Sequence, residues 1–437
     1  MPSGSLTRNA VNDALQRSYV FQRDGQSIAR RRRSLHRPRH RMPRGRFAPY
    51  TINCPDDFDL EQFALPDRLA SVFRILQATG GDGAGEDRIT YSDFSGPELF
   101  EALRHVSQSI RSRRYVPHAT RTALIPKNRE RTKFRELQLH RVVDRVIAKA
   151  LQLSLDGFFR GVLPRLGKDV HDVYAEMQWS ARRNNGHFLT VDDIENCFPN
   201  APIEVVMDCH RRHISQPDLL WLIETIVRGH EGPEHTIGLY QGSPYSPVAM
   251  ELLLHTHLDT RFGTEFRGFP LLLRYVDNIN ILSRNESEGR QAIEFCRTVL
   301  SDLGFRLKGE RPPMDRPVDL TTEHPDRKVL GLNPRWVNGQ LSLSAPESAL
   351  EDLRYGLSEA LTSTAPKDTA LSVIRGWLNS LGPTLTNAVR PGTVDQVIMT
   401  ARECGFSELE RQTLHQISRD AHSRWLTLCE QWRGCRV

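Results

Sequence analysis

Two aspartates at the ends of separate apolar segments have the residue types and spacing needed to hold a divalent cation. Asp277 interrupts the apolar stretch 271–282, in the pattern of two short strands joined by a tight turn. Asp193 ends the earlier apolar segment 189–194, and its neighbour Asp192 should point to the opposite face if the segment is a strand. Carboxylates from two strands can share Mg²⁺, although an acidic residue in an ordinary solvated turn gives the same local pattern.

A loop rich in glycine and proline lies between these two segments. Residues 239–247 read LYQGSPYSP and precede an apolar run that is expected to be helical over 248–257. Ser246 is expected to be the N-cap, with Pro247 at the first helical position. The free backbone N–H groups of such a helix could face a nucleotide or a template strand, and the alternative is an ordinary junction between a loop and a helix.

The order of these segments resembles that of bacterial reverse transcriptases from group II introns and retrons, and most of all the stand-alone enzymes associated with phage defence. Residues 193–198 are similar to the first palm motif of that family, 241–247 to the second and 275–278 to the third. Other similar segments lie upstream in the fingers region and downstream in the palm, at 115–117, 125–127, 135–137, 144–146, 303–307 and 329–332. Ordered matches of several kinds are more specific than any one of them.

The resemblance implies a role for each residue that matches a motif. Asp193 and Asp277 would bind two Mg²⁺ ions, assisted by the carbonyl of Ile194, and Asn278 would complete the catalytic set. Two such ions activate an attacking hydroxyl and stabilise the leaving pyrophosphate. Phe198 would be an aromatic steric gate that excludes a ribose 2′-hydroxyl, so the implied substrate is a dNTP. The alternative for Phe198 is a core aromatic residue.

Further substrate contacts follow from the same resemblance, at Lys127, Arg135, Gln241, Gly242 and Tyr275. Lysine and arginine in the fingers would bind the triphosphate, since an arginine offers a fork of donors and a lysine a point charge. A solvated basic loop is the alternative for this stretch. The lysine of the fourth motif corresponds either to Lys308 or, by strict counting, to Arg311, and both assignments stay open.

One position departs from the family pattern. The third motif normally has two adjacent aspartates, and the second of them is Asn278 in this chain. Asparagine keeps a carbonyl oxygen but lacks the negative charge, which should change metal affinity or geometry. Three interpretations follow: a fully active enzyme, an enzyme that uses Mn²⁺ or is slow or specialised, and a degenerate polymerase that binds nucleic acid without chemistry.

Basic residues are concentrated at the N-terminus of the 437-residue chain. The first 50 residues contain 12 arginines and two aspartates, a net charge of +10, whereas the whole chain carries +6 and the remainder therefore −4. The arginines expected to contact nucleic acid are Arg30, Arg31, Arg32, Arg33, Arg37 and Arg39. Such a segment is expected to be extended until it meets phosphate, and a structured RNA is the expected partner. A merely solubilising extension is the alternative.

Composition and cysteine usage indicate a cytoplasmic protein. No stretch approaches the ~20 apolar residues of a membrane span, and no secretory apolar core is found near the N-terminus. The seven cysteines show no paired C-x-x-C spacing, which is typical of reduced thiols. Cys209, His210 and His213 are interpreted as helix surface or packing, in preference to a zinc site.

The fold class that the resemblance implies is α+β, as a right-hand polymerase. It would have α-helical fingers, a palm built from an antiparallel sheet and helices, and a helical thumb. The predicted division is an arginine-rich extension over 1–50, fingers over 51–188, palm over 189–345 and thumb over 346–437. Helical periodicity predicts thumb helices over 348–361, 369–381 and 407–432. Tryptophans 377, 425 and 432 are expected in the core.

The implied function is RNA-templated DNA synthesis. A primer 3′-hydroxyl, or a protein or RNA hydroxyl, would attack a dNTP that is paired with an RNA template, and the product would be DNA. Two Mg²⁺ ions would assist the reaction, with Mn²⁺ as the alternative metal. No integrase, RNase H or endonuclease segment is recognised, which by analogy favours antiphage defence with a dedicated noncoding RNA. Alternatives are a template-independent or unusually templated nucleotidyltransferase working with a partner polymerase, and a noncatalytic RNA-binding pseudo-polymerase. Self-association is a further possibility, and no membrane partner is expected.

Overall fold

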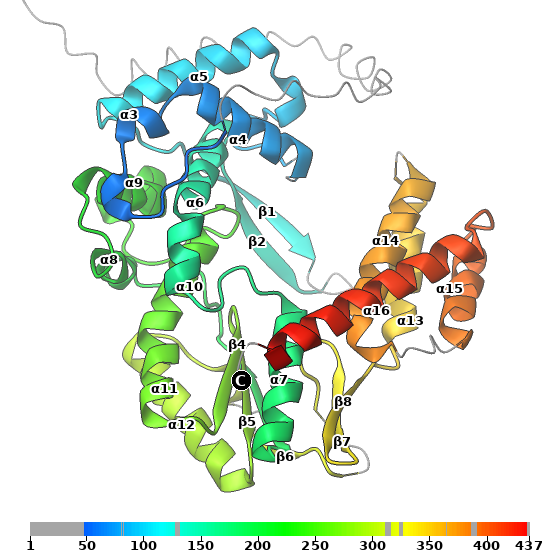
Figure 1. Cartoon of the computed structure of the whole chain (residues 1–437). Coiled ribbons are helices and arrows are strands. Elements are labelled where there is room, and N and C mark those ends of the chain that lie inside the picture. The colour runs from blue at the N-terminus through cyan, green and yellow to red at the C-terminus, as the bar shows by residue number, and fades with distance from the viewer. Residues whose placement is uncertain are drawn as a thin grey trace, which may run out of the picture. The chain divides into compact units, whose positions relative to one another are not determined.

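The computed structural model describes most of the chain after the arginine-rich N-terminus (Figure 1). The described residues are 48–79, 81, 83–126, 132–310, 316–322, 327–363, 365–385 and 391–434. They form two compact units. The first takes its described residues from Met1–Arg121, Leu139–Phe158 and Ser215–Gly232, and the second from Thr122–Gln138, Phe159–Ile214 and Pro233–Val437. The division into fingers, palm and thumb stays a prediction.

The first unit is helical. Its helices are α3 (Leu60–Phe63), α4 (Pro66–Thr79), α5 (Gly96–Arg111), α9 (Pro217–Arg228) and α6 (Val142–Val162) up to residue 158. Helix α5 begins where Ser95 and Glu98 cap each other's backbone N–H groups. On α6, the buried carboxylate of Asp144 accepts hydrogen bonds from the Tyr115 hydroxyl at 2.9 Å and from the His118 backbone N–H at 3.0 Å. These bonds satisfy a charge that would be costly to bury alone.

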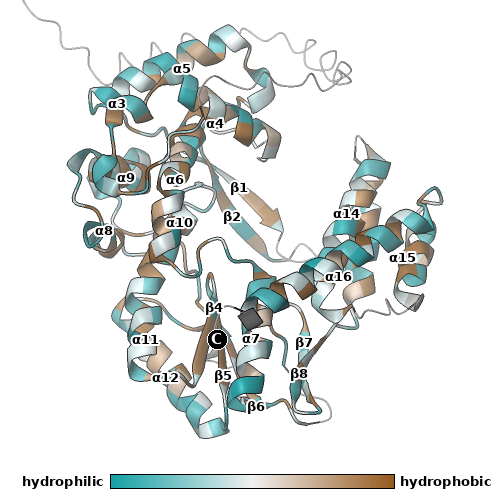
Figure 2. Cartoon of the chain, in the orientation of Figure 1, coloured by the Kyte–Doolittle hydropathy of each residue, from teal (hydrophilic) through white to brown (hydrophobic). Residues whose placement is uncertain are grey.

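The second unit contains a four-stranded antiparallel sheet in the order β4-β5-β3-β6. Its strands are β3 (Phe188–Asp193), β4 (Leu271–Tyr275), β5 (Asn278–Ser283) and β6 (Val318–Asp319). Two further hairpins are β1 (Arg121–Pro126) with β2 (Phe134–Leu139) and β7 (Asn333–Val337) with β8 (Gln340–Ser344). Figure 2 shows β4 and β5 as strongly hydrophobic strands, which agrees with their burial.

Helices precede, connect and follow the strands of this sheet along the chain. They are α7 (Val170–Asn184), α8 (Ile203–Arg211), α10 (Ser246–Leu254), α11 (Thr260–Glu265) and α12 (Glu286–Asp302). A π-helical turn, His255–Asp259, connects α10 to α11. In the described part of the chain, no helix combines the length and the apolar character needed to cross a membrane.

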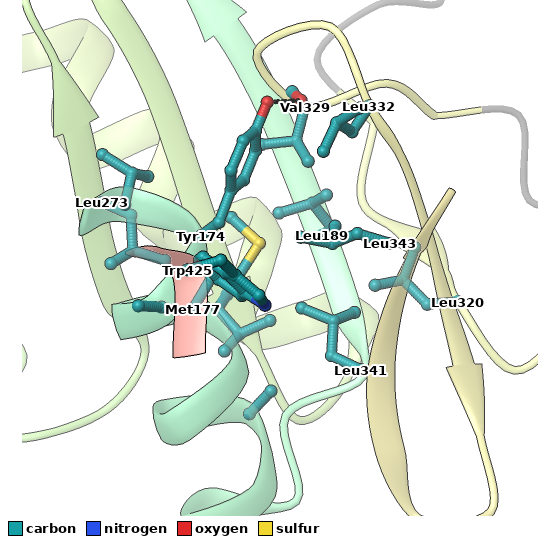
Figure 3. Packing of buried hydrophobic residues seen from close by; sticks show 14 of the residues in the cluster. Tyr174, Met177, Leu189, Leu273, Leu320, Val329, Leu332, Leu341, Leu343 and Trp425 are labelled. Carbon is teal, nitrogen blue, oxygen red and sulfur yellow. Dashed lines mark hydrogen bonds between the residues drawn. The ribbon is translucent and has the colours of Figure 1, made fainter. Parts of the chain in front are cut away.

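One apolar cluster packs against the sheet (Figure 3). Leu189 of β3 and Leu273 of β4 are fully buried in it, next to Met177 of α7 and Trp425 of the C-terminal helix. Burying a leucine contributes about 1.5–3 kcal/mol, so the cluster fixes which face of β3 points inward. On β3, Leu189 and Val191 pack in this cluster, and Asp193 continues the same face because side chains alternate along a strand.

Four helices follow the last hairpin, and their shared interior is a second apolar cluster. They are α13 (Ala349–Ala360), α14 (Pro366–Ser380), α15 (Pro391–Glu403) and α16 (Arg411–Gly434). Helices α13, α14 and α16 lie close to the three predicted thumb segments, whereas α15 was not predicted. Its buried Val394, Val397, Ile398 and Ala401 follow helical spacing, so the sequence did contain the signal. Trp425 is buried as expected, and tryptophans 377 and 432 are partly buried against the clusters.

Candidate active site

The predicted hairpin that carries Asp277 is confirmed. Strand β4 ends at Tyr275 and β5 begins at Asn278, so the turn consists of Val276 and Asp277. Val276 has φ 53°, which is unusual for a β-branched residue. The backbone N–H of Ile194 donates to the Asp277 carbonyl at 3.0 Å, which places this turn beside the end of β3.

Asp193 and Asp277 lie close enough to influence each other. Asp193 stands opposite Asn278 in the register of β3 and β5. Burial raises the pKa of Asp277, and the negative charge of Asp193 raises it further, whereas Lys308 and Arg135 act in the opposite direction. The Lys308 ammonium lies 2.7 Å from a carboxylate oxygen of Asp193. One carboxylate at the end of β3 and one in the turn between β4 and β5 therefore interact electrostatically with each other and with two basic side chains.

This donor set fits a divalent cation bound by few protein ligands. The negative charge of Asp193 makes ionisation of Asp277 less favourable, and a bound cation would remove that cost. Among the described residues, no group of three or more histidine, cysteine, aspartate or glutamate side chains is arranged to hold a metal. Mg²⁺ commonly uses one or two carboxylates and completes its shell with water and phosphate oxygens, so Asp193 and Asp277 suit it.

Asn278 supports Asp277 through a hydrogen bond. Its side-chain N–H donates to Asp277 Oδ1 at 3.3 Å. An aspartate at this position would accept hydrogen bonds only, and its charge would repel Asp277. The asparagine therefore orients the neighbouring carboxylate without adding a third negative charge.

Asp192 lies on the opposite face of β3 from Asp193 and supports the site through hydrogen bonds. It is 5% exposed, and its Oδ1 accepts hydrogen bonds from the Gly309 N–H at 3.0 Å and the Asp193 N–H at 2.7 Å. Gly309 lies in the short turn Lys308–Glu310. Asp192 thereby holds the turn that presents Lys308 to Asp193. Of the two candidates for the fourth-motif cation, Lys308 is at the site and Arg311 lies outside the described residues.

The Gln241–Gly242 segment positions strand β2. The Gln138 N–H donates to the Gln241 carbonyl at 2.6 Å. Gly242 has φ 118°, and a Cβ there would lie 2.6 Å from the Gln138 carbonyl oxygen, so only glycine fits. Strand β2 carries the exposed Arg135, whose charge acts on Asp277. The loop therefore fixes the strand that presents this cation.

The start of α10 corrects one prediction. Tyr245 is the N-cap in a helical conformation, Ser246 is the first helical residue and Pro247 the second. Ser246 is not the cap because Tyr245 is already anchored: its side chain is fully buried, and its hydroxyl lies 3.0 Å from His210 Nε2. The predicted helix end at 257 falls within the π-helical turn His255–Asp259.

His210 is a packing residue, as predicted for this segment. Its Nδ1 lies 2.8 Å from the Val206 carbonyl, so it donates there and Nε2 accepts from Tyr245. Burial lowers the pKa of His210 to about 4, which keeps the ring neutral. Cys209 is buried beside it on α8.

The remaining predicted residues are less closely tied to the aspartates. Phe198 is partly buried, and its carbonyl accepts from the Leu239 N–H at 2.8 Å. Tyr275 is partly buried against the apolar cluster of the sheet. Ile194 is fully buried. The predicted residues that lie outside the described part are Lys127 and the arginines Arg30, Arg31, Arg32, Arg33, Arg37 and Arg39.

Sequence reasoning missed Arg274, which directly precedes the motif at Tyr275. Its side chain has no exposure, and it pairs with Glu251 and Asp259. The available signal was a single charged residue in the apolar run 271–275. A charge in such a place requires partners, which only the structure identifies.

The chain was compared with known protein families and structures. Residues 125–311 match the family model described as reverse transcriptase (RNA-dependent DNA polymerase). No curated protein matches the chain in sequence. The telomerase of Candida albicans, solved with a fragment of telomeric RNA, is 12% identical, with a TM-score of 0.39 over 75% of this chain and 68% of that one. The Sicinivirus 3Dpol RNA-dependent RNA polymerase is 13% identical, with a TM-score of 0.47 over 80% of this chain and 74% of that one.

The match covers strands β3, β4 and β5 of the four-stranded sheet, the loop 239–247 and both aspartates. The chain therefore contains a reverse transcriptase domain with a polymerase-like fold of helices and antiparallel sheet. Its enzyme class is RNA-directed DNA polymerase.

Proposed function

We propose that this chain is a divalent-metal-dependent reverse transcriptase that joins dNTPs on an RNA template. The observation that carries the proposal is that Asp193 and Asp277 lie within electrostatic reach of each other at the end of β3, with Lys308 paired to Asp193 and the charge of Arg135 acting on Asp277. When bound, Mg²⁺ would neutralise phosphate charge and activate the attacking hydroxyl. Asp193 and Asp277 would hold it, together with the Ile194 carbonyl.

The surrounding residues would bind and select the nucleotide. Arg135 on β2, with Lys127, would bind the triphosphate, because an arginine fork matches phosphate oxygens. Gln241 and Gly242 would line the nucleotide site and keep β2 in place, and Tyr275 would contact substrate at the end of β4. Phe198 would exclude the ribose 2′-hydroxyl.

Incorporation of dNTPs on a primed RNA template tests the proposal. Asp277→Ala should lower the rate at least ~1000-fold in both Mg²⁺ and Mn²⁺, because catalysis of this type depends on charge stabilisation at one place. Asp302→Ala removes an exposed carboxylate from the same unit and should leave the rate unchanged. Equal activity of Asp277→Ala and the unaltered chain would reject the proposal.

Sugar selection gives a separate test of Phe198. Phe198→Ala should allow NTP incorporation if the ring is the gate, whereas an unchanged preference for dNTPs would assign the ring to packing. The measurement is the ratio of kcat/KM for dGTP and GTP on one template.

We further propose a biological role in antiphage defence, with a dedicated noncoding RNA as template. The support is the resemblance to stand-alone defence reverse transcriptases and the arginine-rich N-terminus, which suits RNA phosphates. Phage plating on cells that carry the unaltered chain or Asp277→Ala, with sequencing of copurified RNA and DNA, tests this role. Protection that survives Asp277→Ala would instead favour an RNA-binding pseudo-polymerase.

A further inference from the structure

A buried ionic cluster lies directly behind the catalytic turn. At its centre is Arg274 of β4, whose five N–H groups are all used. Two bonds go to Glu251, at 2.8 and 2.7 Å, and two go to Asp259, at 2.9 and 2.7 Å. The fifth, from Nη1, goes to the Val276 carbonyl at 2.9 Å.

This fifth bond reaches the residue that precedes Asp277. Val276 has a positive φ and a side chain that is 39% exposed, so apolar packing contributes little to holding the turn. A hydrogen bond from a rigid and fully buried guanidinium fixes the Val276 carbonyl and therefore the start of the Asp277 backbone. The strained conformation is maintained by this contact and by the bond from Ile194.

The guanidinium is itself anchored to two helical elements. Glu251 lies on α10, and Asp259 ends the π-helical turn that follows it. Arg165 adds a second anchor, because it donates to the carbonyls of Leu272 at 2.6 Å and Arg274 at 3.2 Å. Among the strands that the structure describes, β4 is at the edge of its sheet, and these bonds satisfy carbonyls that no described strand pairs with.

A contribution to folding stability does not by itself explain why this ionic cluster is buried. Burial opposes the charge of Arg274, yet Asp259 and Glu251 outweigh that effect and raise its pKa. Replacing buried ion pairs by apolar residues of similar volume is often neutral or stabilising, so such a cluster requires another benefit. The benefit here is a hydrogen bond that an apolar side chain cannot make.

We propose that Arg274 is a positioning residue for the reverse transcriptase reaction: held by Glu251 and Asp259, it fixes the Val276–Asp277 turn in the geometry that binds metal and substrate. The inference rests on the proposed function for its kinetic consequence only. The mechanical part, that Arg274 holds the turn, stands independently of activity.

Hydrogen exchange of the full-length chain tests the mechanical part. Arg274→Lys keeps the charge near Glu251 and Asp259 but replaces five donors in a planar fork by three on one nitrogen, which cannot reproduce the bonds to both carboxylates and to the Val276 carbonyl. Amides of the turn, 276–278, should exchange at least ~10-fold faster in this variant, while amides of β3 change less than about threefold. The matched control is Arg228→Lys, since Arg228 is also buried and paired with a glutamate, at 2.8 Å.

Kinetics test the consequence for catalysis. With active sites counted by single-turnover bursts, Arg274→Lys should lower kcat about 10–100-fold and leave the KM for dNTP within about threefold, because a shift of about 1 Å at reacting groups can cost 100-fold. A merely structural role would instead lower the burst amplitude and leave the rate per active site unchanged.

The outcomes separate this inference from the proposed function. Turn exchange that is unchanged in Arg274→Lys, or that rises equally in β3, overturns the inference even if the unaltered chain is active. An unaltered chain that incorporates no dNTP overturns the proposed function, and faster exchange confined to the turn then still supports the positioning role.

Discussion

The Val276–Asp277 turn and the four C-terminal helices are stabilised by opposite kinds of interior. Behind the turn, the fully buried Arg274 is surrounded by Glu251 and Asp259. In the described residues of 349–434, by contrast, the buried side chains are apolar apart from Thr400 and Ser418. Both regions belong to the same unit of one chain, so the difference reflects what each interior must hold in place.

The difference follows from directionality. Apolar burial is non-directional and suffices to keep helices α13–α16 together. A turn that must present one carboxylate within a fraction of an ångström requires donors that point at its backbone, and those donors must be paired when they are buried. Changes in the apolar interior should therefore affect stability, and changes in the ionic interior should affect catalysis.

A large loss of stability without a change in catalysis is expected in the C-terminal helices. Leu357 of α13 has no exposure, so Leu357→Ala should lower the free energy of unfolding by about 2–5 kcal/mol through lost transfer energy and a cavity. The rate of dNTP incorporation per active site should stay unchanged at a temperature where the variant is folded. Denaturant titration measures the first quantity. Leu361→Ala, at a 50% exposed position beside the same helix, should cost much less.

Replacing the buried ionic cluster by apolar side chains should affect the rate of catalysis and the folding stability differently. Arg274→Met alone leaves two buried carboxylates without their main partner and should cost about 3–5 kcal/mol. The triple variant Glu251→Met, Asp259→Leu, Arg274→Met should regain most of that stability, yet its kcat should remain about 10–100-fold low because the bond to Val276 is missing. Recovery of both properties together would show that the ionic cluster has no positioning role.

A third kind of interior is neutral and polar, and its example is the buried hydrogen bond between His210 and Tyr245. The dependence of folding stability on pH should reveal it. Because burial lowers the folded-state pKa of His210 to about 4 from 6.5, the unfolded chain binds more protons between these values. Stability should therefore fall as pH drops from 7.5 to 5, by about 2 kcal/mol from this residue.

Variants can assign that loss to His210. His210→Gln should flatten the dependence of unfolding free energy on pH, while His213→Gln, at an exposed neighbouring position, should flatten it less. Part of the slope should persist in both variants, because burial also lowers the pKa of His140 to about 4. An identical slope in His210→Gln and the unaltered chain would contradict the buried neutral ring.

The smallest effect is expected at Asn278. Asn278→Asp restores a second carboxylate and removes the hydrogen bond to Asp277, so the Mg²⁺ concentration for half-maximal incorporation should fall about two- to fivefold with little change in kcat. A Mg²⁺ titration measures this. Asn285→Asp makes the same chemical change at the exposed cap of α12 and should leave the titration unchanged. A higher Mg²⁺ requirement in Asn278→Asp would show that the neutral amide favours metal binding.

Features set by short stretches of chain could be predicted from the sequence. Strands β3, β4 and β5 were predictable from apolar runs that end at an acidic residue. The turn was predictable from the two residues between Tyr275 and Asn278. Gly242 was recognisable as a loop residue, but its close approach to Gln138 was not, because the two lie in distant segments. Ser246 was mistaken for a cap because local capping chemistry was outweighed by the burial of Tyr245.

The sequence by itself determined the two aspartates, the order of the motifs and the strands that carry them, because backbone preferences and side-chain alternation act over a few residues. Only the tertiary structure decided that Lys308 faces Asp193 and that Arg274 reaches Val276. Partners of Arg274 and its strand come from positions 15, 23 and 109 residues away along the chain. The partners of a buried charged side chain come from segments that only folding brings together, so no local sequence pattern identifies them.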